Sequence, residues 1–558
     1  MTSSRPGRFV FDVHEESSIE LPLADHELTL GHSLGWSVAR YGPRPAMVFD
    51  QRRWSYDELV SEVEQCARAL VVCGVTKGSR VGLLLGARPE FVIAAYATAL
   101  VGGISVFIST FSNGADLEWI LHHSDTSLLI AHEEVRGRMV RLPRPGGTAL
   151  PFLERVVPLG EWSDFLATGD DCDAAVVAAR CEEVFPTDDA VLLYTSGSTS
   201  LPKAVLHMHR SPVMQGFHMA DCMAIGSEDR TFTSFPLFWT AGWLTGVAAP
   251  FAVGACTVLQ EVFDPLEAGA LIERERITSV RQMIHDELRL VAAETEHPHD
   301  LSSVDVGIVT EPLRARTSMT GEPAEICAWG MTETFAIATT LPFDAPLELR
   351  RTTMGRPVSG NRIRIRDQVN GRTLGPGQVG EITVAGLSLM RGYYKSTDPL
   401  PIDEEGYLRT GDAGQLREDG YLVFAGRLDR LIKTAGVNVS PVEIEEHLRS
   451  WGGVGTCAVI GVPHPSLGTA VVLCAARRGD EVDVNEAEIK TALRELLPSY
   501  KVPHAVLFFD EDEFVLTSSS KVDIRALRPV AIRRLLESNI DQTWRALLRE
   551  VPEGPSDD

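Results

Sequence analysis

Apolar and polar positions follow two different periods in the first part of the chain. Ser55 with Glu58 gives the pattern of a capping box, and apolar side chains then continue at helical spacing up to Gly74, at Leu59, Val63, Cys66, Ala67 and Leu70. The segment 80–109 then predicts a buried strand, a helix and a second strand in that order. This alternation indicates a mainly parallel sheet that is covered by helices.

Later segments have different patterns. Residues 355–425 resemble short strands joined by glycine turns. Further on, Ser440 and Glu443 predict a second capping box, with Pro441 suited to the first helical turn, and a smaller α+β unit follows. Residues 529–549 predict an added amphipathic helix near the C-terminal end.

The predicted fold class is α/β. A chain of 558 residues is too long for one core, so we expect at least two domains. The first, residues 1–428, would be a large N-terminal domain of helix-covered mixed sheets with a β-rich subdomain. The second, residues 429–558, would be a small α+β C-terminal domain that ends in the extra helix.

Composition excludes several classes of protein. A formal net charge of −25 argues against a general nucleic-acid binder, although a few local cations are enough for small anionic ligands. No apolar run is long enough to cross a bilayer, and the first twenty residues lack the apolar segment of a secretory signal. Nine cysteines without a CxxC pair indicate reduced thiols. We therefore expect a cytoplasmic protein without a membrane span.

The stretch YTSGSTSLPK, residues 194–203, is rich in hydroxyl groups and ends in a lysine. It does not match the pattern GxxxxGK[ST], which disfavours an ordinary P-loop NTPase. Its backbone N–H groups and hydroxyls can still surround a polyphosphate while Lys203 supplies positive charge. Taken alone, the stretch is equally consistent with a polar turn after a strand.

Other segments add groups that suit a nucleotide. In WGMTET, the Trp329 ring can stack on a purine, Thr332 can bind phosphate, and Glu333 can hold Mg²⁺ through oxygen. Asp412 is an acceptor suited to ribose hydroxyls, and Lys521 lies late in the chain. Each residue alone is consistent with a solvated surface group, but their order and spacing together point to nucleotide chemistry.

With these segments in this order, the chain resembles the adenylate-forming superfamily of acyl-CoA synthetases, peptide-synthetase adenylation domains and luciferases. The resemblance spans roughly residues 30–528. The family's phosphate-loop signature matches YTSGSTSLPK, its adenine and magnesium motif matches WGMTE, and its ribose aspartate matches Asp412. Its hinge motif matches GRLDR at residues 426–430, and its final catalytic lysine matches Lys521.

The resemblance implies a reaction in two steps. A carboxylate attacks the α-phosphate of Mg·ATP and gives an acyl-adenylate and pyrophosphate, and coenzyme A then takes the acyl group. The residues that the resemblance assigns to ATP are Thr195, Ser196, Gly197, Ser198, Thr199, Lys203, Trp329, Gly330, Met331, Thr332, Asp412 and Arg427. Those that it assigns to catalysis are Lys203, Thr332, Glu333 and Lys521, with Glu333 as the metal ligand.

The resemblance also implies a mobile C-terminal domain. This domain would rotate about Asp429, withdraw Lys521 and present Arg430, Lys433 and Gly436 to coenzyme A. The acid would lie against Phe238, Trp239, Gly242 and Glu311.

The sequence departs from the family pattern at several places. Ser200 and Ala204 stand where glycines are common in the phosphate loop, and SSSK replaces the usual SGK around Lys521. In PLFWTAG, Trp239 occupies the usual histidine position, where it could gate the acid channel or simply pack. An aspartate that would pair with an α-ammonium is missing there, so an amino-acid substrate is disfavoured. The usual GGAP segment is replaced by a shorter piece that contains Glu311, either a substrate contact or a solvated loop charge.

These features favour an ATP-dependent acid–CoA ligase for a small or medium apolar or aromatic carboxylic acid. The alternative keeps adenylation but passes the activated acid to an amine or a carrier protein, or activates nitrite as diazotising relatives do. A non-catalytic nucleotide binder would have lost Glu333 or Lys521, and both are present. We expect ATP, Mg²⁺ and coenzyme A as cofactor and co-substrates, no nucleic-acid partner, and a monomer or homodimer.

Overall fold

The computed structural model describes residues 21–549 except residues 113, 136, 196–201, 282–283, 308–309, 320–326, 343, 435–436, 452–453, 478–483, 517–521 and 539. The chain divides into two units. The first comprises the chain up to Ile363 together with Val384–Leu408, and the second comprises Arg364–Thr383 and the chain from Arg409 onward. A functional boundary at residues 428 and 429 stays a prediction.

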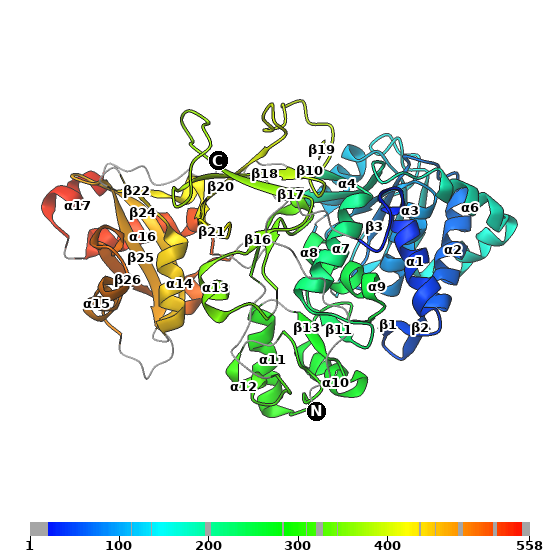
Figure 1. The fold of residues 1–558 in the computed structure, drawn as a ribbon, viewed down its shortest axis with the longest axis horizontal. Helices are drawn as coiled ribbons and strands as arrows, with labels where there is room; N and C mark the ends of the chain where they lie inside the picture. The colour runs from blue at the N-terminus through cyan, green and yellow to red at the C-terminus, as the bar shows by residue number, and fades with distance from the viewer. Residues whose placement is uncertain are drawn as a thin grey trace. The chain divides into compact units, whose positions relative to one another are not determined.

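Two mixed sheets form the framework of the first unit (Figure 1). The seven-stranded sheet has the order β19 (Gly392–Tyr393), β10 (Lys203–Met208), β9 (Asp189–Thr195), β4 (Ile104–Phe107), β3 (Arg80–Leu84), β5 (Thr126–Ala131), β8 (Arg155–Pro158). The five-stranded sheet has the order β13 (Ser279–Arg281), β11 (Arg230–Thr233), β12 (Cys256–Leu259), β1 (Pro45–Phe49), β2 (Arg52–Ser55). The parallel pairs β4–β3 and β3–β5 confirm the predicted parallel arrangement.

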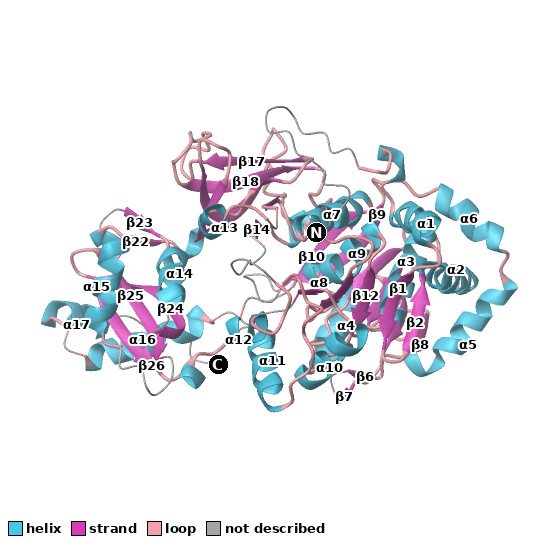
Figure 2. Ribbon diagram, turned by 60° about the horizontal axis from the view of Figure 1, so that its bottom comes forward, coloured by secondary structure: helices cyan, strands magenta, loops and turns pink. Residues whose placement is uncertain are grey.

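Helices cover both faces of these sheets, as Figure 2 shows. One buried cluster contains residues of both sheets and of α1 (Leu30–Tyr41), α2 (Tyr56–Val72), α3 (Pro89–Leu100), α7 (Arg210–Cys222), α8 (Thr240–Trp243) and α9 (Ala249–Val253). The outer face of the five-stranded sheet is covered by α10 (Pro265–Glu275) and α11 (Ile284–Glu296), and that of the seven-stranded sheet by α4 (Gly114–His123). The remaining helices of this unit are α5 (Trp162–Ala167), α6 (Ala174–Glu182), α12 (Glu311–Arg314) and α13 (Leu347–Thr352).

Local sequence signals set several of these boundaries. The predicted capping box at the start of α2 is present, with Ser55 and Glu58 bonded reciprocally to each other's backbone N–H groups. Helix α14 (Pro441–Trp451) begins at the predicted proline, and Ser440 Oγ accepts from Glu443 N at 3.3 Å. The Glu443 carboxylate is bonded to Lys501 Nζ at 2.6 Å and 2.7 Å.

Short strands connect the large sheets to the rest of the chain. Strands β14 (Ala328–Trp329), β15 (Thr339–Thr340) and β16 (Arg356–Pro357) form a small sheet. The glycine-rich region predicted to be β-rich forms a four-stranded sheet of β17 (Asn361–Arg366), β18 (Gly380–Gly386), β20 (Leu408–Leu416) and β21 (Leu422–Arg427). Two short antiparallel pairs are formed by β6 (Glu134–Val135) with β7 (Arg138–Met139), and by β22 (Ile432–Thr434) with β23 (Val437–Val439).

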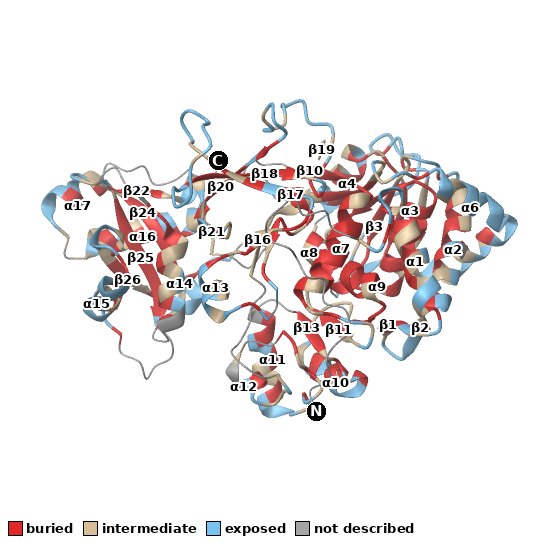
Figure 3. Cartoon of the chain, viewed as in Figure 1, coloured by how far each residue is buried: buried red, intermediate tan, exposed pale blue. Residues whose placement is uncertain are grey.

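The second unit contains a three-stranded sheet of β24 (Val454–His464), β25 (Gly468–Arg477) and β26 (Ala505–Phe509). Helices α14 and α15 (Glu486–Leu496) contribute to the buried cluster on one face. The other face is covered by α16 (Ile524–Glu537) and α17 (Gln542–Arg549). Figure 3 shows buried residues along β24 and β25 between these helices. None of the described helices is long and apolar enough to cross a membrane.

The single helix predicted for residues 529–549 is wrong. The segment forms two helices, α16 and α17, and Pro529 lies inside the first. Helix α16 begins earlier because Asp523 caps it by accepting from Arg525 N and Ala526 N. The apolar side of α17 is covered within the unit, because Trp544 is buried and its Nε1–H donates to Pro463 O at 2.8 Å. This buried side chain therefore gives no support for a dimer contact.

Removal of the Trp544 ring should weaken the attachment of α17 to β24. We expect Trp544→Ala to lower the free energy of local opening there by about 3 kcal/mol, because a large buried ring and a satisfied N–H are lost. Hydrogen exchange of the β24 amides in the intact protein measures this change. Trp544→Phe keeps most of the apolar contact and should cost about 1 kcal/mol, whereas equal exchange in all three proteins would contradict the packing account.

Candidate active site

Three side chains from distant parts of the sequence meet beside strand β10. Lys203 begins this strand, and its Nζ lies 5.0 Å from the centroid of the Tyr393 ring. The Tyr393 hydroxyl donates to Glu333 Oε1 at 2.6 Å. Strand β19 pairs with β10 and places Tyr393 opposite Val205, two residues from Lys203, so the pairing fixes the tyrosine beside the lysine. Two predicted residues, Lys203 and Glu333, thus lie on either side of a tyrosine that sequence reasoning missed.

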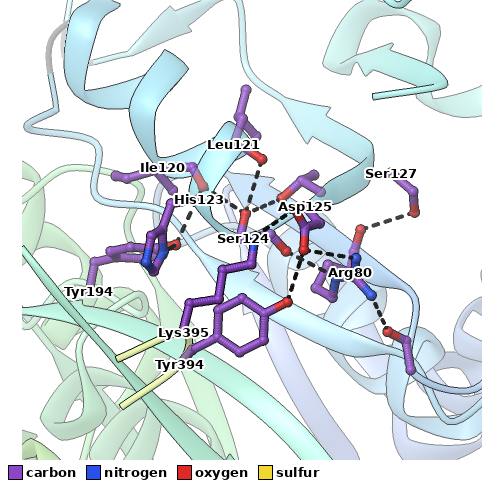
Figure 4. Close-up of polar contacts among 12 residues, drawn as sticks. Arg80, Ile120, Leu121, His123, Ser124, Asp125, Ser127, Tyr194, Tyr394 and Lys395 are labelled. Atoms are coloured by element: carbon purple, nitrogen blue, oxygen red, sulfur yellow. Dashed lines mark hydrogen bonds and ion pairs between the residues drawn. The ribbon is translucent and has the colours of Figure 1, made fainter. Parts of the chain in front are cut away.

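The chain after Tyr393 is tied to the other side of the seven-stranded sheet. As Figure 4 shows, Asp125 accepts from Lys395 Nζ at 2.7 Å and from Tyr394 OH at 3.1 Å. Arg80 Nη2 lies 3.6 Å from the same carboxylate. Asp125 has a positive φ of 51°, which is uncommon for a residue other than glycine.

 That φ of 51° lies in the left-handed region, which aspartate tolerates better than most residues. The cluster holds residues 394–395 and, through them, the adjacent Tyr393.

The loop that carries Glu333 is fixed by bonds to its backbone. His207, from β10, donates through Nε2 to Thr332 O at 2.7 Å, and Met390 N donates to Glu333 O at 2.8 Å. The Glu333 side chain is buried, while Thr332 is partly exposed. These bonds leave the Thr332 hydroxyl and the Glu333 carboxylate as the chemical groups that the loop presents.

A second set of contacts holds the residues that follow the motif. Gln215, from α7, donates through Nε2 to Thr334 O at 2.8 Å and also to Ile337 O. Phe335 and Ala336 both have a positive φ, 51° and 79°, although neither is a glycine. Backbone conformations of this kind are costly and persist where the surroundings impose them, which is common at functional sites.

Buried histidines make this part of the unit sensitive to acid. Burial lowers the pKa of His207, His209 and His218 to about 4 in each case. Their ordinary pKa is about 6.5, so the unfolded chain binds these protons at a higher pH than the folded chain does. The stability that neutral histidines contribute is therefore complete above pH 6.5 and is lost as the pH falls towards 4.

We accordingly expect the free energy of unfolding of the first unit to fall by about 2 kcal/mol or more between pH 7 and pH 4.5. Asp221 has a smaller effect of the opposite sign. Burial raises its pKa to about 6, so the folded protein takes up this proton more readily than the unfolded chain as the pH falls. Thermal unfolding across this pH range measures the slope, and His218→Gln should make it shallower. A midpoint that does not change from pH 7 to pH 4.5 would contradict the role of the buried histidines.

The other predicted residues of the WGMTET motif have structural contacts of their own. Trp329 is buried on β14, where it pairs with Thr339. A Cβ on Gly330 would lie 2.1 Å from Ala336 O, so the close passage of that backbone requires glycine. Met331 N donates to Thr334 Oγ1 at 3.1 Å, and this bond closes the turn. Purine stacking on Trp329 stays a prediction.

The hydroxyl-rich loop is only partly described. Thr195 ends β9, lies opposite Lys203, and donates through Oγ1 to Lys203 O at 3.4 Å. The predicted phosphate ligands Ser196, Gly197, Ser198 and Thr199 lie outside the described residues. Lys521, which was predicted to be catalytic, and Gly436 also lie outside them, and so do the side chains of Glu311 and Asp429.

In the second unit, Asp412 and Arg427, two residues predicted to bind ATP, form an ion pair with each other. They stand opposite each other on β20 and β21, and Arg427 Nη1 donates to Asp412 Oδ1 at 2.8 Å. Asp412 is buried, whereas Arg427 is exposed. Arg430 and Lys433 are exposed as well, the first in a short 3₁₀ turn (Leu428–Arg430) and the second on β22. Their proposed roles toward ATP and coenzyme A stay predictions.

Aromatic side chains gather around the predicted acid-binding segment. The Trp239 ring is nearly parallel to that of Phe111, with centroids 6.3 Å apart, and both rings contact Phe238 edge-on. Phe111, which the sequence did not single out, is 40% exposed, so this cluster offers apolar surface. A Cβ on Gly242 would lie 1.9 Å from Pro236 O, so glycine lets α8 approach that turn. Trp243 is instead fully buried in the core.

Comparison with known proteins identifies the family. Residues 34–394 match the AMP-binding enzyme family, and residues 443–521 match the AMP-binding enzyme C-terminal domain. The chain belongs to the AMP-binding enzyme family. This result confirms the predicted resemblance to acyl-CoA synthetases and the prediction that the chain is an adenylating enzyme of the acid–CoA ligase type.

Relatives cover almost the whole chain. It is 31% identical to the 3-[(3aS,4S,7aS)-7a-methyl-1,5-dioxo-octahydro-1H-inden-4-yl]propanoyl:CoA ligase of Mycobacterium tuberculosis, over 86% of this chain and 95% of that protein. It is 28% identical to the acyl-CoA ligase sidI of Aspergillus fumigatus, over 93% of each. Among solved structures, the anthranilate CoA ligase AuaEII in complex with anthranoyl-AMP is similar with a TM-score of 0.75 at 24% identity, over 91% of this chain and 98% of that one. This similarity confirms the predicted fold class.

Proposed function

We propose that the protein converts a small or medium apolar or aromatic carboxylic acid into its coenzyme A thioester through an acyl-adenylate. The observation that carries the proposal is the meeting of Lys203, Tyr393 and Glu333 at 2.6–5.0 Å in a chain of the AMP-binding enzyme family. A cation and a carboxylate beside each other suit the phosphates of ATP and their metal ion.

In the first step, a carboxylate oxygen of the acid attacks the α-phosphorus of ATP. The new bond joins that oxygen to phosphorus, the bond between the α-phosphorus and the bridging oxygen breaks, and pyrophosphate leaves. Lys203 offers positive charge to the phosphates, and Lys521 would stabilise the charge that develops around the α-phosphorus. Thr332 offers a hydroxyl donor from the loop that His207 fixes.

In the second step, the sulfur of coenzyme A attacks the acyl carbonyl carbon. The carbon–sulfur bond forms, the bond from that carbon to the AMP oxygen breaks, and the thiol proton is released. We propose that the small domain turns about Asp429 between the steps and brings Arg430, Lys433 and Gly436 to the thiol.

The residues around Glu333 fit Mg²⁺ bound together with ATP. Glu333 Oε1 accepts from Tyr393, and the carboxylate offers oxygen atoms that can bind a metal ion. No group of three or more histidine, cysteine, aspartate or glutamate side chains in the described part of the chain could hold a metal alone. Magnesium typically combines one or two carboxylates with substrate phosphates and water, which this donor set allows. When bound, the ion would neutralise phosphate charge.

Two observations support the acid class and the acceptor. The cluster of Phe111, Phe238 and Trp239 offers apolar surface to an organic acid. The names of the relatives describe CoA ligases for acids with ring systems, which supports coenzyme A as the acceptor. The alternative function is transfer of the activated acid to an amine or a carrier protein, or activation of nitrite. The first experiment must distinguish this alternative from a coenzyme A ligase.

That experiment measures pyrophosphate release with Mg·ATP over aliphatic and aryl carboxylates, an amino-substituted aryl acid and nitrite, with and without coenzyme A. Mass spectrometry identifies the products. We expect turnover on one class of carboxylate that requires coenzyme A and yields its thioester. Pyrophosphate release that is indifferent to coenzyme A but accelerated by an amine would reject the ligase function in favour of the alternative.

A further inference from the structure

Arg281 is a buried cation, and in the described part of the chain two of its three guanidinium nitrogens have no hydrogen-bond partner. Arg281 is the last residue of strand β13 and is 6% exposed. Its backbone oxygen accepts from Ser234 N at 2.9 Å. Within the described part of the chain, neither Nε nor Nη2 of its guanidinium has a hydrogen-bond partner. A buried guanidinium normally has both hydrogen bonds and a counter-charge, because an isolated buried charge is strongly destabilising.

The buried carboxylate of Glu275 in the same unit is paired with two arginines. Glu275, which is 4% exposed, accepts from Arg53 at 2.6 Å and from Arg230 at 2.5 Å. By contrast, the titratable group that interacts electrostatically with Arg281 is the Cys222 thiol. Burial raises the pKa of this thiol, so it is neutral at pH 7. Burial lowers the pKa of Arg281 to about 10. The guanidinium thus keeps its charge at neutral pH while the described chain supplies no carboxylate to balance it.

The strand register shows which way Arg281 points. Val280 belongs to the apolar cluster on the outer face of the five-stranded sheet, and successive side chains of a strand alternate between faces. Arg281 therefore lies on the inner face, beside Thr233, its partner in parallel β11. Thr233 Oγ1 accepts from Thr245 Oγ1 at 3.2 Å, so this face meets the helical segment that follows α8.

Two parts of the predicted site are connected to the neighbours of Arg281. The predicted acid-binding segment leaves the sheet directly after Thr233 and continues to Phe238 and Trp239. On another side, Cys222 is bonded to Thr340 Oγ1 at 2.8 Å, and Thr340 pairs with the strand that carries Trp329. Ligands of α/β proteins typically bind at the carboxyl ends of parallel strands, where Arg281 stands.

We propose that Arg281 determines substrate specificity by binding a second carboxylate of the acid, so that the substrate is a dicarboxylic acid with an apolar or aromatic body. This inference rests on the proposed function and refines its substrate class. One carboxylate would be adenylated, and the other would supply the hydrogen bonds and the charge that the guanidinium lacks. The aromatic cluster would contact the body between the two carboxylates.

The test compares matched pairs of acids that differ only in the second carboxylate: butanoate with succinate, hexanoate with adipate, and benzoate with the three benzenedicarboxylates. For the wild-type protein we expect kcat/KM for pyrophosphate release to be at least about 100-fold higher for the best diacid than for its matched monoacid, because a site with a buried polar group rejects an analogue that leaves it unpaired. In Arg281→Met this preference should fall by about 100-fold, through a loss of kcat/KM for the diacid.

Controls separate specificity from folding. Arg281→Met replaces an unpaired buried charge with an apolar side chain of similar length, so its thermal unfolding midpoint should not fall. Arg276→Met removes the same charge from an exposed site paired with Asp300 and should keep the diacid preference. Without ATP, the best diacid should raise the unfolding midpoint of the wild type and of Arg276→Met but not that of Arg281→Met.

The other outcomes are equally decisive. If the wild type turns over both members of each pair alike and Arg281→Met keeps that ratio, the inference is wrong while the proposed function stands. If Arg281→Met loses monoacids and diacids equally, the guanidinium serves the reacting carboxylate, which also overturns the inference. If no acid supports pyrophosphate release, the proposed function fails and the inference fails with it.

Discussion

Glu333→Gln is expected to slow pyrophosphate release by about 100-fold or more at saturating acid. The amide retains an oxygen that can accept from the Tyr393 hydroxyl, so the loop should keep its shape, but the negative charge that suits Mg²⁺ is lost. The concentration of Mg²⁺ needed for half-maximal rate should rise at the same time. Steady-state kinetics across a magnesium titration measures both effects.

Tyr393→Phe is the matched control, because it removes the bond to Glu333 Oε1 and keeps the carboxylate. We expect a reduction of about 10-fold without a comparable change in the magnesium requirement. If Glu333→Gln left the rate and the magnesium dependence unchanged, the assignment of Glu333 to the metal would be wrong.

Lys521→Ala is expected to reduce adenylate formation by about 100- to 1000-fold, because one preorganised charge near the developing transition-state charge is removed. The second step should be spared. When the variant is given a preformed acyl-adenylate, thioester formation from coenzyme A should proceed within a few-fold of the wild-type rate, because the domain rotation proposed above withdraws Lys521 before that step. Single-turnover measurements of the two steps separate them.

Arg528→Ala removes one positive charge from the exposed side of α16 and should leave both steps unchanged. If Lys521→Ala slowed adenylate formation and thioester formation equally, the lysine would serve both steps or stabilise the protein as a whole. That result would contradict a domain rotation that withdraws Lys521 between the steps.

Local pattern was sufficient for much of the fold. The capping box at Ser55 and the proline at 441 start helices where predicted, because such signals act within one turn. Alternating segments in the first hundred residues predicted a parallel sheet, since helical crossovers impose that pairing. The C-terminal segment was mispredicted because Asp523 and the break at Ser538 act through capping and tertiary contacts that apolar spacing does not show.

Only those site residues that belong to a sequence motif could be predicted. Lys203 and Glu333 belong to recognisable stretches, whereas Tyr393 reaches them through the pairing of two-residue β19 with β10, which no local signal indicates. Arg281 is equally hidden, because an arginine at the end of a short strand looks like a surface residue until its burial is known. Long-range register and burial decide both cases, and neither is encoded in a short window of sequence.

The most direct test of adenylation measures the transfer of ¹⁸O from the carboxylate of the acid to AMP. The acid identified in the substrate panel is labelled with ¹⁸O in its carboxylate and incubated with Mg·ATP, coenzyme A and the protein. Attack of the carboxylate on the α-phosphorus followed by thioester formation leaves one carboxylate oxygen on AMP, so the account predicts AMP with one ¹⁸O and unlabelled pyrophosphate. Unlabelled AMP, or ADP with ¹⁸O in inorganic phosphate, would contradict the formation of an acyl-adenylate.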